Sequence, residues 1–187
     1  MSGSAQGERL PADLVVVGIG GIPNQELAQA ADITCTNGIV TNEFGQSSDP
    51  NIWAAGDCTN HPNHFAGLRL RLESVQNATD QGRSVGSTIA GSPLPYTSVP
   101  RFWSDQYEAK LQIVGLVSRD DEQVVRGSIE DGRFSIFSFQ HGRLLSVESV
   151  NRPGEQMISR RLADAVSPTR LQVEDSAFDL RHLVSAP

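Results

Sequence analysis

The stretch Ser47–Asp57, with the sequence SSDPNIWAAGD, decides how the first half of this 187-residue chain is interpreted. Its apolar part, Ile52–Ala55, predicts a short buried strand that stops at Gly56 and places the Asp57 carboxylate just beyond the carboxyl end of the strand. In open α/β sheets, ligands bind in the crevice outside these strand ends. Gly56 would let the backbone approach a ligand closely, and Asp57 would accept hydrogen bonds from sugar or polyol hydroxyl groups. The alternative for Asp57 is a residue that only caps a turn.

The stretch Arg71–Ala78, with the sequence RLESVQNA, predicts the beginning of a long helix that extends to Ala90. Small and apolar residues recur at spacings of three and four along it, which is typical of a helix packed closely on a sheet. The N-terminus of a helix offers free N–H groups and a partial positive charge, so it suits anionic oxygens. An ordinary acidic helix start would explain Glu73 but not the whole octet. The candidate binding residues of this stretch are Glu73, Ser74, Val75 and Gln76.

A glycine-rich run, Gly18–Pro23, lies between the apolar run Leu14–Val17 and a predicted helix that ends at Ala30. Leu14–Val17 is typical of a buried parallel strand. The glycine run differs from the dinucleotide fingerprint GxGxxG, because Pro23 occupies the place of the third glycine and no acidic residue ends a second strand about 20 residues later. The pattern therefore favours a tight strand-to-helix turn over a pyrophosphate cradle.

Two adjacent aromatic residues, Phe102 and Trp103, begin the stretch FWSDQY. Together with the Asp105 carboxylate and the Gln106 amide, they could form a stacking wall for a flat ring. The alternative is a single aromatic core residue on an edge strand, and we prefer this interpretation for Phe102. Trp103 is therefore the aromatic candidate for a binding role.

The second half of the chain, from about residue 98, has a different pattern. Asp131–Gly132 and His141–Gly142 lie between neighbouring apolar stretches, where hairpin turns place residues with positive φ. The pattern predicts an antiparallel meander, then a helix after Pro153 with an apolar face, and one helical turn in the tail. The four apolar stretches are Leu111–Val117, Gln123–Ser128, Phe134–Phe139 and Leu144–Val150, and the apolar face comprises Met157, Ile158, Leu162 and Val166.

Composition excludes several classes of function. With 22 acidic and 15 basic residues the formal net charge is −7, which argues against a nucleic-acid partner. No apolar stretch approaches the ~18–20 residues that span a bilayer, and the N-terminus lacks the apolar core of a signal peptide. The two cysteines, Cys35 and Cys58, exclude a disulfide framework. We therefore expect a cytoplasmic protein with free thiols and no membrane partner.

Two histidines, His61 and His64, flank a Pro-Asn pair after the first stretch. Their spacing could hold a metal ion weakly. Solvated loop histidines are the better interpretation, so we expect no metal site here.

Several of these stretches together resemble one family, the FAD-dependent NAD(P)H:ferredoxin reductases of bacterial oxygenase and cytochrome P450 electron-transfer chains. The putidaredoxin, rubredoxin and biphenyl-dioxygenase ferredoxin reductases are its type, and apoptosis-inducing factor is a relative. LPADLVVVGIGGIPNQELA resembles the end of the family's NAD domain, and SSDPNIWAAGDC resembles its second FAD motif. RLESVQNATDQG resembles its flavin-edge helix, and FWSDQY with KLQIVGL resembles the start of its C-terminal domain.

The resemblance implies a fold class of α/β plus α+β. Residues 1–97 would be the end of the NAD domain and the return segment of the FAD domain, a remnant of a doubly wound FAD/NAD-binding domain. Residues 98–187 would be the C-terminal interface or dimerisation domain, with an antiparallel sheet and helices. Both GxGxxG fingerprints would lie upstream of residue 1, in an N-terminal half that this chain lacks.

The resemblance also implies an activity. The intact enzyme would pass electrons from NADH or NADPH through FAD to a ferredoxin-type iron–sulfur protein, with the flavin supplying the chemistry. Asp57 would bond the ribityl chain, Val75 and Gln76 would present backbone N–H groups to the pyrimidine edge of the flavin, and Trp103 would lie beside the ring. No side chain of this chain need act as a general acid or base. Arg101 stands where the family often has an aromatic residue, which puts a simple aromatic clamp in doubt.

Three hypotheses follow: a half-reductase active only with its missing half, a stand-alone binding or dimerisation module, or a relic without an independent role. The first predicts weak or absent FAD binding by the isolated chain. It also predicts uncovered apolar surface around Val15, Val17, Ile52 and Trp53, which would favour a homo-oligomer or partial disorder of residues 1–97. A basic rim for an acidic ferredoxin would comprise Arg69, Arg71 and Arg101. The alternative for Arg71 is a fixed structural pair with Glu73 or Asp105.

Overall fold

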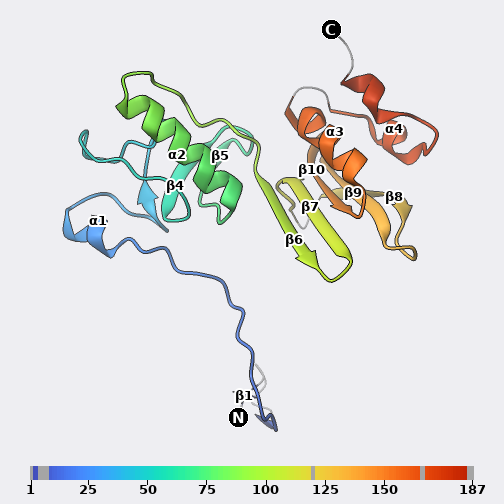
Figure 1. The fold of residues 1–187 in the computed structure, drawn as a ribbon, viewed down its shortest axis with the longest axis horizontal. Coiled ribbons are helices and arrows are strands. Elements are labelled where there is room, and N and C mark those ends of the chain that lie inside the picture. The colour runs from blue at the N-terminus through green and yellow to red at the C-terminus, as the bar shows by residue number, and fades with distance from the viewer. Residues whose placement is uncertain (1, 4–8, 119–120, 165–166, 185–187) are drawn as a thin grey trace.

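The computed structural model describes residues 2–3, 9–118, 121–164 and 167–184, and Figure 1 shows two sheet-containing parts connected after a long helix. Near the N-terminus, β1 (Ser2–Gly3) pairs antiparallel with β2 (Arg9–Leu10). Among the helices of the described ranges, none is long and apolar enough to cross a membrane.

A three-stranded sheet and one long helix form the first part. The strands are β3 (Ile39–Val40), β4 (Thr59–Asn63) and β5 (Leu68–Leu70), in the order β3-β4-β5. β3 runs parallel to β4, and β4 runs antiparallel to β5. The short helix α1 (Glu26–Ala30) precedes the sheet, and α2 (Val75–Ile89) follows it and lies alongside it in Figure 1. The long helix expected from the small and apolar spacing is therefore confirmed.

Two predicted strands of the first part are wrong. Leu14–Val17 is extended but outside any strand, and its side chains are 52–87% exposed. Ile52–Ala55 forms only an isolated bridge, between Trp53 and Gln46. A strand needs a hydrogen-bonded neighbour, and among the described residues none lies beside Leu14–Val17. Val15, Val17 and Ile52 are exposed, as expected of an uncovered apolar surface, but Trp53 is half-buried.

An antiparallel five-stranded sheet forms the second part. Its order is β6-β7-β10-β9-β8, so β8, β9 and β10 form a meander but β7 pairs with β10 rather than with β8. The predicted simple meander is therefore wrong at this pairing. The chain between β7 and β8 has to cross the ends of two strands. The strands are β6 (Arg101–Gln106), β7 (Ala109–Gly115), β8 (Glu122–Ser128), β9 (Arg133–Gln140) and β10 (Arg143–Val150).

The predicted turns of this sheet are confirmed. His141 and Gly142 both have positive φ, 51° and 77°, and connect β9 to β10. This combination is typical of a two-residue hairpin turn. Gly132, with φ of 61°, lies between β8 and β9.

Three C-terminal helices cover one face of this sheet (Figure 1). They are α3 (Pro153–Asp164), α4 (Arg170–Glu174) and the 3₁₀ helix η1 (Leu180–Leu183). Leu162, Val173 and Leu180 pack with Phe137 and Val147 in the core. The helix after Pro153 is confirmed, but Met157 is 72% exposed and does not belong to its apolar face. Val166 lies outside the described residues.

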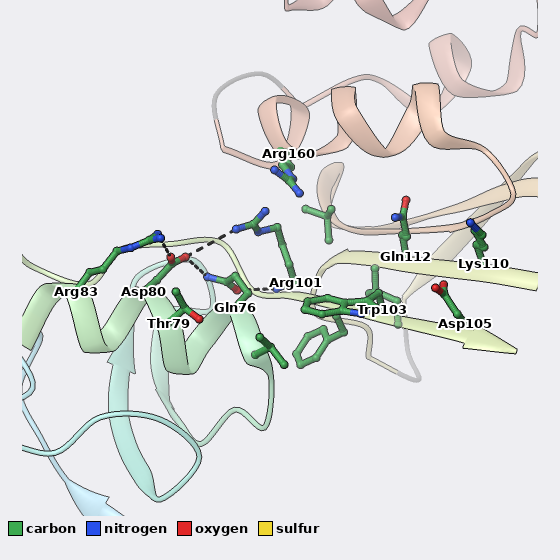
Figure 2. Close-up of a pocket in the computed structure, with 14 residues that line it drawn as sticks. Gln76, Thr79, Asp80, Arg83, Arg101, Trp103, Asp105, Lys110, Gln112 and Arg160 are labelled. Carbon is green, nitrogen blue, oxygen red and sulfur yellow. Dashed lines mark hydrogen bonds and ion pairs between the residues drawn. The ribbon is translucent and has the colours of Figure 1, made fainter.

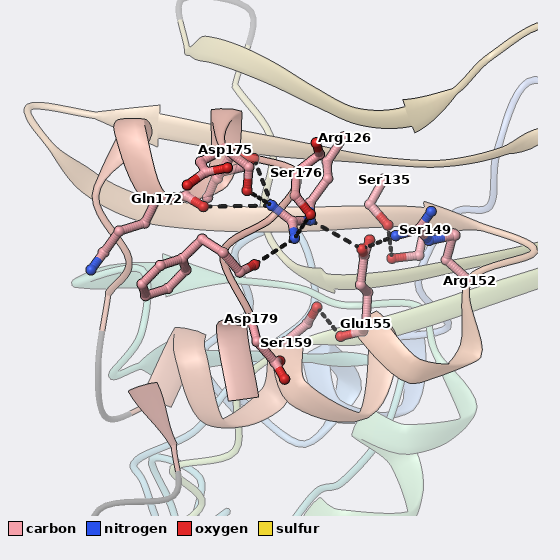
Figure 3. Close-up of polar contacts among 12 residues, drawn as sticks. Arg126, Ser135, Ser149, Arg152, Glu155, Ser159, Gln172, Asp175, Ser176 and Asp179 are labelled. Carbon is pink, nitrogen blue, oxygen red and sulfur yellow. Dashed lines mark hydrogen bonds and ion pairs between the residues drawn. The ribbon is translucent and has the colours of Figure 1, made fainter. Parts of the chain in front are cut away.

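Arg126 attaches the C-terminal segment to the sheet (Figure 3). Its guanidinium group donates to the backbone carbonyls of Asp175 and Phe178, each at 2.7 Å, and its Nε lies 3.3 Å from the Glu155 carboxylate of α3. Because the side chain of Arg126 is only 10% exposed, these partners compensate for the loss of its hydration. The sheet, α3 and the tail therefore form one packed unit, and the α+β character of the second part is confirmed.

Candidate functional site

The N-terminus of α2 has two backbone donors without a partner. Ser74 is the N-cap, and its hydroxyl oxygen accepts a hydrogen bond from the Asn77 N–H at 3.1 Å. The Ala78 N–H donates to the Ser74 carbonyl. Within the described part of the chain, the N–H groups of Val75 and Gln76 have no acceptor, so this helix end can bind a partly negative oxygen.

Gly56 and Asp57 form a turn against the same helix. Gly56 has φ of +86°, its N–H donates to the side-chain carbonyl of Gln81 at 2.6 Å, and a Cβ there would lie 3.5 Å from Ala78. Asp57 is exposed and precedes β4, so its expected position after a buried strand is wrong. The expectation failed because Ile52–Ala55 lacks strand partners. The turn nevertheless lies beside α2, as a shared site requires.

Arg71 connects this turn to the beginning of α2. Its guanidinium group lies 2.5 Å from the Glu73 carboxylate and 3.2 Å from the Asp57 carbonyl oxygen. It also donates to the Asn37 side chain at 3.3 Å and lies 3.5 Å from the Gly21 carbonyl oxygen. Asp57 and Glu73, which the sequence suggested separately, are therefore brought together by one side chain. Glu73 lies just before the N-cap rather than inside the first turn.

A cleft of about 490 Å³ lies between α2, β6, β7 and α3 (Figure 2). Val75 and Gln76 border it from α2, and Trp103 borders it from β6 with 54% of its surface exposed. The two residues that carry the free donors therefore border the same cleft as the exposed indole. β6 is an outer strand of the sheet, and the half-buried Phe102 also contributes to the cleft wall.

The cleft carries more basic than acidic side chains. Its basic residues are Arg83, Arg101, Lys110 and Arg160, and its acidic residues are Asp80 and Asp105. The Asp80 carboxylate lies 3.3 Å from Arg83 and 3.8 Å from Arg101. Partial burial, together with the neighbouring Arg101 guanidinium group, lowers the pKa of Arg160 from its ordinary value. The cleft thus has a local positive charge on a chain whose net charge is negative.

The expected basic rim is only partly in this cleft. Arg101 lines it, but Arg71 does not and is 13% exposed in its pair with Glu73. Arg69 donates to the carbonyls of Thr41 and Asn60, outside the cleft. The exposed basic groups that do line the cleft are Arg83, Lys110 and Arg160, which the sequence pattern did not single out as a group.

His61 is a buried strand residue rather than a solvated loop residue. It belongs to β4, is 2% exposed and contacts Tyr96 edge to face with ring centroids 5.2 Å apart. Burial lowers the pKa of His61 to about 4. His64 is exposed as expected, and the described ranges contain no group of three or more His, Cys, Asp or Glu side chains able to hold a metal ion. Thr59, His61 and Asn63 alternate in burial along β4, but all three are polar, so no apolar alternation in the sequence marked this strand.

Two family models match this chain. The model for the pyridine nucleotide-disulphide oxidoreductases matches residues 4–82, and the model described as reductase C-terminal matches residues 101–184. Together the two matches cover most of the chain, which therefore combines part of a pyridine nucleotide-disulphide oxidoreductase domain with a reductase C-terminal domain.

Curated relatives narrow the class. Rhodocoxin reductase of Rhodococcus erythropolis is 48% identical over 176 residues, which are 94% of this chain and 41% of that protein. Putidaredoxin reductase of Pseudomonas putida is 44% identical over 185 residues, which are 96% of this chain and 43% of that protein. The chain therefore spans less than half the length of these relatives.

Solved structures agree with the sequence relatives. The ferredoxin reductase for the CYP199A2 system of Rhodopseudomonas palustris matches with a TM-score of 0.90 and 45% identity, over 95% of this chain and 44% of that one. The reductase in a covalent putidaredoxin reductase–putidaredoxin complex matches with a TM-score of 0.88 and 42% identity, over 96% and 43%. In sequence and in fold, this chain is similar to the C-terminal half of these ferredoxin reductases.

Proposed function

We propose that this chain is the C-terminal half of a flavoprotein oxidoreductase that passes electrons from NADH or NADPH through FAD to a ferredoxin-type iron–sulfur protein, which serves an oxygenase or a cytochrome P450. The observation that carries the proposal is the shared cleft, in which Val75 and Gln76, whose N–H groups have no acceptor among the described residues, border the same space as the exposed Trp103. Residues 1–97 contribute the NAD- and FAD-domain portion, and residues 98–187 contribute the interface domain. The location of such an enzyme is the cytoplasm.

The residues present fit one end of FAD. Val75 and Gln76 bind the pyrimidine edge through their N–H groups, Glu73 and Ser74 hold that helix end in place, and Trp103 lies beside the ring. Gly56 allows close approach, and the exposed Asp57 carboxylate has no hydrogen-bond partner within the described residues, so it is available to the ribityl hydroxyl groups. When bound, the flavin supplies the acceptor for a hydride and releases single electrons.

The same residues do not hold the pyrophosphate of FAD. A pyrophosphate is normally bound at a glycine-rich helix N-terminus. Gly18–Pro23 belongs to no helix or strand, and the next helix, α1, begins only at Glu26. The predicted strand-to-helix turn is therefore wrong, and in the proposed enzyme a GxGxxG segment other than this run would hold the pyrophosphate.

The exposed basic side chains of the cleft support a ferredoxin-type partner. Arg83, Lys110 and Arg160 surround the cleft that also contains Trp103, so an acidic protein bound there would lie next to the flavin. A rim of this kind raises the association rate and is weakened by salt. The relative solved in complex with putidaredoxin supports a protein partner of this class.

A stand-alone binding or dimerisation module is the second candidate. The exposed apolar run Leu14–Val17 favours it, because contiguous apolar surface promotes association. The rest of the proposed enzyme would equally cover this run, and Ile19 and Ile22 extend it with about nine-tenths of their surface exposed.

Reconstitution separates the two candidates. The isolated chain and a completed enzyme, in which the upstream half of rhodocoxin reductase is joined to this chain, are compared for flavin content and NADH-dependent reduction of ferricyanide. We expect no dialysis-resistant flavin in the isolated chain, and flavin with activity in the completed enzyme. If the isolated chain retained equimolar flavin, with absorbance at about 450 nm, it would have to bind the pyrophosphate of FAD by itself, which would contradict the proposal. A folded but flavin-free completed enzyme would favour the stand-alone module.

A further inference from the structure

A buried glutamine connects the two parts of the molecule. Gln76 lies in the first turn of α2 and is 7% exposed. Its side-chain carbonyl accepts a hydrogen bond from the Arg101 backbone N–H at 3.1 Å, and its side-chain amide donates to the Asp80 carboxylate at 2.6 Å (Figure 2). One side chain therefore joins the helix of the first part to the first residue of β6 in the second.

The Arg101 N–H would otherwise have no partner in the sheet. β6 is an outer strand, and its only neighbour among the described strands is β7. The carbonyl of Pro100 accepts from the Gly115 N–H, and hydrogen-bonding positions alternate along antiparallel strands. The N–H of Arg101 thus faces away from β7 and towards α2. A buried donor without an acceptor is costly, which gives the Gln76 contact energetic weight.

The side chain of Arg101 also contacts Asp80, the residue to which the Gln76 amide donates. Its guanidinium group lies 3.8 Å from the Asp80 carboxylate, whose other oxygen lies 3.3 Å from Arg83. The Asp80 side chain is 21% exposed, whereas Arg83 is 73% exposed. Gln76, Asp80 and Arg101 therefore form the shielded part of the network, and Arg83 is its solvent-exposed branch.

Arg101 places one end of the network on the same strand as Trp103. Arg101 and Trp103 are two residues apart on β6, so both side chains project from the same face of the strand, and both line the cleft. The free N–H groups of Val75 and Gln76 belong to the other side of that cleft. A shift of the start of β6 relative to α2 would therefore change the separation between the indole and the helix N-terminus.

We propose that Gln76, Asp80 and Arg101 form a latch in which the Gln76 side chain is a positioning residue that sets Trp103 relative to the N-terminus of α2. The latch is a property of the chain itself, and its relevance to flavin chemistry rests on the proposed function. In that enzyme it sets the spacing between the stacking surface and the hydrogen-bonding edge of the ring. This role of the side chain is separate from that of the Gln76 backbone N–H.

Hydrogen exchange of the Arg101 amide in the isolated chain tests the latch without any flavin. The Gln76→Ala variant removes the acceptor, so exchange at Arg101 should accelerate about tenfold or more, while amides of the central strand β9 keep their rates. Failure of the proposed function would not affect this measurement. An unchanged Arg101 rate, or an equal acceleration throughout the sheet, would overturn the latch, because Gln76 would then be irrelevant or only a general stability residue.

A matched control breaks a second contact between the two parts, at a distance from the latch along the sequence. Arg143 of β10 donates to the Phe65 carbonyl at 3.3 Å and lies over the Phe65 ring at 5.4 Å. Arg143→Met should leave exchange at Arg101 unchanged. If it accelerated that exchange as much as Gln76→Ala does, loosening of the whole junction rather than the latch would explain the result.

A swap of donor and acceptor supplies the rescue. Gln76→Glu keeps an acceptor for Arg101 but places a second carboxylate against Asp80. The Arg101 amide should therefore exchange about as fast as it does in Gln76→Ala. Combining it with Asp80→Asn restores a donor opposite the new carboxylate and should return the Arg101 rate to within about threefold of the original. Acrylamide quenching of Trp103, measured in a Trp53→Phe background, should change in Gln76→Ala and in Gln76→Glu. It should return towards the original value in the double variant. The latch would be contradicted if the Arg101 amide exchanged as fast in the double variant as in Gln76→Glu. It would also be contradicted if the quenching of Trp103 were the same in all variants.

Discussion

Arg71 and Glu73 form an ion pair at 2.5 Å immediately before α2, with Arg71 13% and Glu73 45% exposed. Arg71 also donates a hydrogen bond to the backbone carbonyl of Asp57. Two segments that lie apart in the sequence, the turn at Asp57 and the beginning of α2, are thereby fixed together. The chemistry assigned to Asp57 and to the helix N-terminus depends on that arrangement.

Replacing Arg71 should therefore cost more than replacing a surface arginine. Arg71→Met leaves carbonyl oxygens and a carboxylate without their shielded donor, and we expect the free energy of unfolding to fall by about 1–3 kcal/mol. Arg83→Met is the matched control, since the Arg83 side chain is 73% exposed in its pair with Asp80, and it should change stability by less than about 1 kcal/mol. Urea unfolding measures both. Equal effects would mean that Arg71 does not organise the site.

Gly45 should tolerate no side chain. It has φ of +76°, and a Cβ there would lie 2.3 Å from Val85 and 3.0 Å from the Ala54 carbonyl oxygen. Gly45→Ala is expected to lower stability by about 2–4 kcal/mol, through backbone strain and overpacking against α2.

Gly67→Ala isolates the backbone component of that loss. Gly67 has φ of +67° with nothing within 4 Å of the added Cβ, so its cost should be about 1–2 kcal/mol. A Gly45 variant no worse than the Gly67 variant would show that α2 does not pack on this turn as described.

His61 should make the chain less stable in mild acid. Burial holds the pKa of His61 at about 4, below its ordinary 6.5, so the folded chain binds fewer protons than the unfolded chain between these values. The contribution of His61 is present above about pH 6.5 and is lost as pH falls towards 4. The loss is on the order of 2–3 kcal/mol.

The His61→Leu variant removes this dependence. Urea midpoints of both proteins are compared at several pH values between 7.5 and 4.5, since the carboxylates titrate equally in both and cancel in the difference. The advantage of the native chain over the variant should shrink with acidification. A difference that is constant with pH would indicate that His61 is solvated.

Charge reversal of the basic residues that line the cleft should slow electron transfer to the ferredoxin partner and leave the flavin chemistry largely unchanged. In the completed enzyme, Arg83→Glu with Arg160→Glu is expected to lower the rate of ferredoxin reduction about tenfold at low salt. NADH-dependent ferricyanide reduction should change little, because a small acceptor needs no docking. Arg69→Glu is the comparison, since Arg69 lies outside the cleft. If Arg69→Glu had the larger effect, the partner would dock elsewhere.

Local signals in the sequence predicted local structure well. Ser74 caps α2 through its own hydroxyl group, and His141–Gly142 turns a hairpin through two positive φ angles, so neighbouring residues suffice for both. Leu14–Val17 failed as a strand because strand formation depends on a partner, which apolar character cannot supply. The pairing of β7 with β10 was missed for a related reason, since it joins segments about 35 residues apart.

The candidate site followed the same rule. Asp57, Glu73 and Trp103 were recognisable by residue type, but the network that arranges them was not. Arg71 and Gln76 make their contacts across long stretches of sequence, to Asp57 and Arg101 respectively. Pairwise contacts of this kind leave no periodic pattern, so only the three-dimensional arrangement reveals them.

Emission from Trp103 in the completed enzyme tests the central claim most directly. In a Trp53→Phe background of this chain, with tryptophans of the upstream half also replaced, Trp103 is the one reporter. If the flavin lies in the cleft between α2 and β6, loading about one FAD per chain should quench most of its emission, and removing FAD should restore it. Full flavin content with unquenched Trp103 would contradict the account, because the ring would then lie away from the cleft.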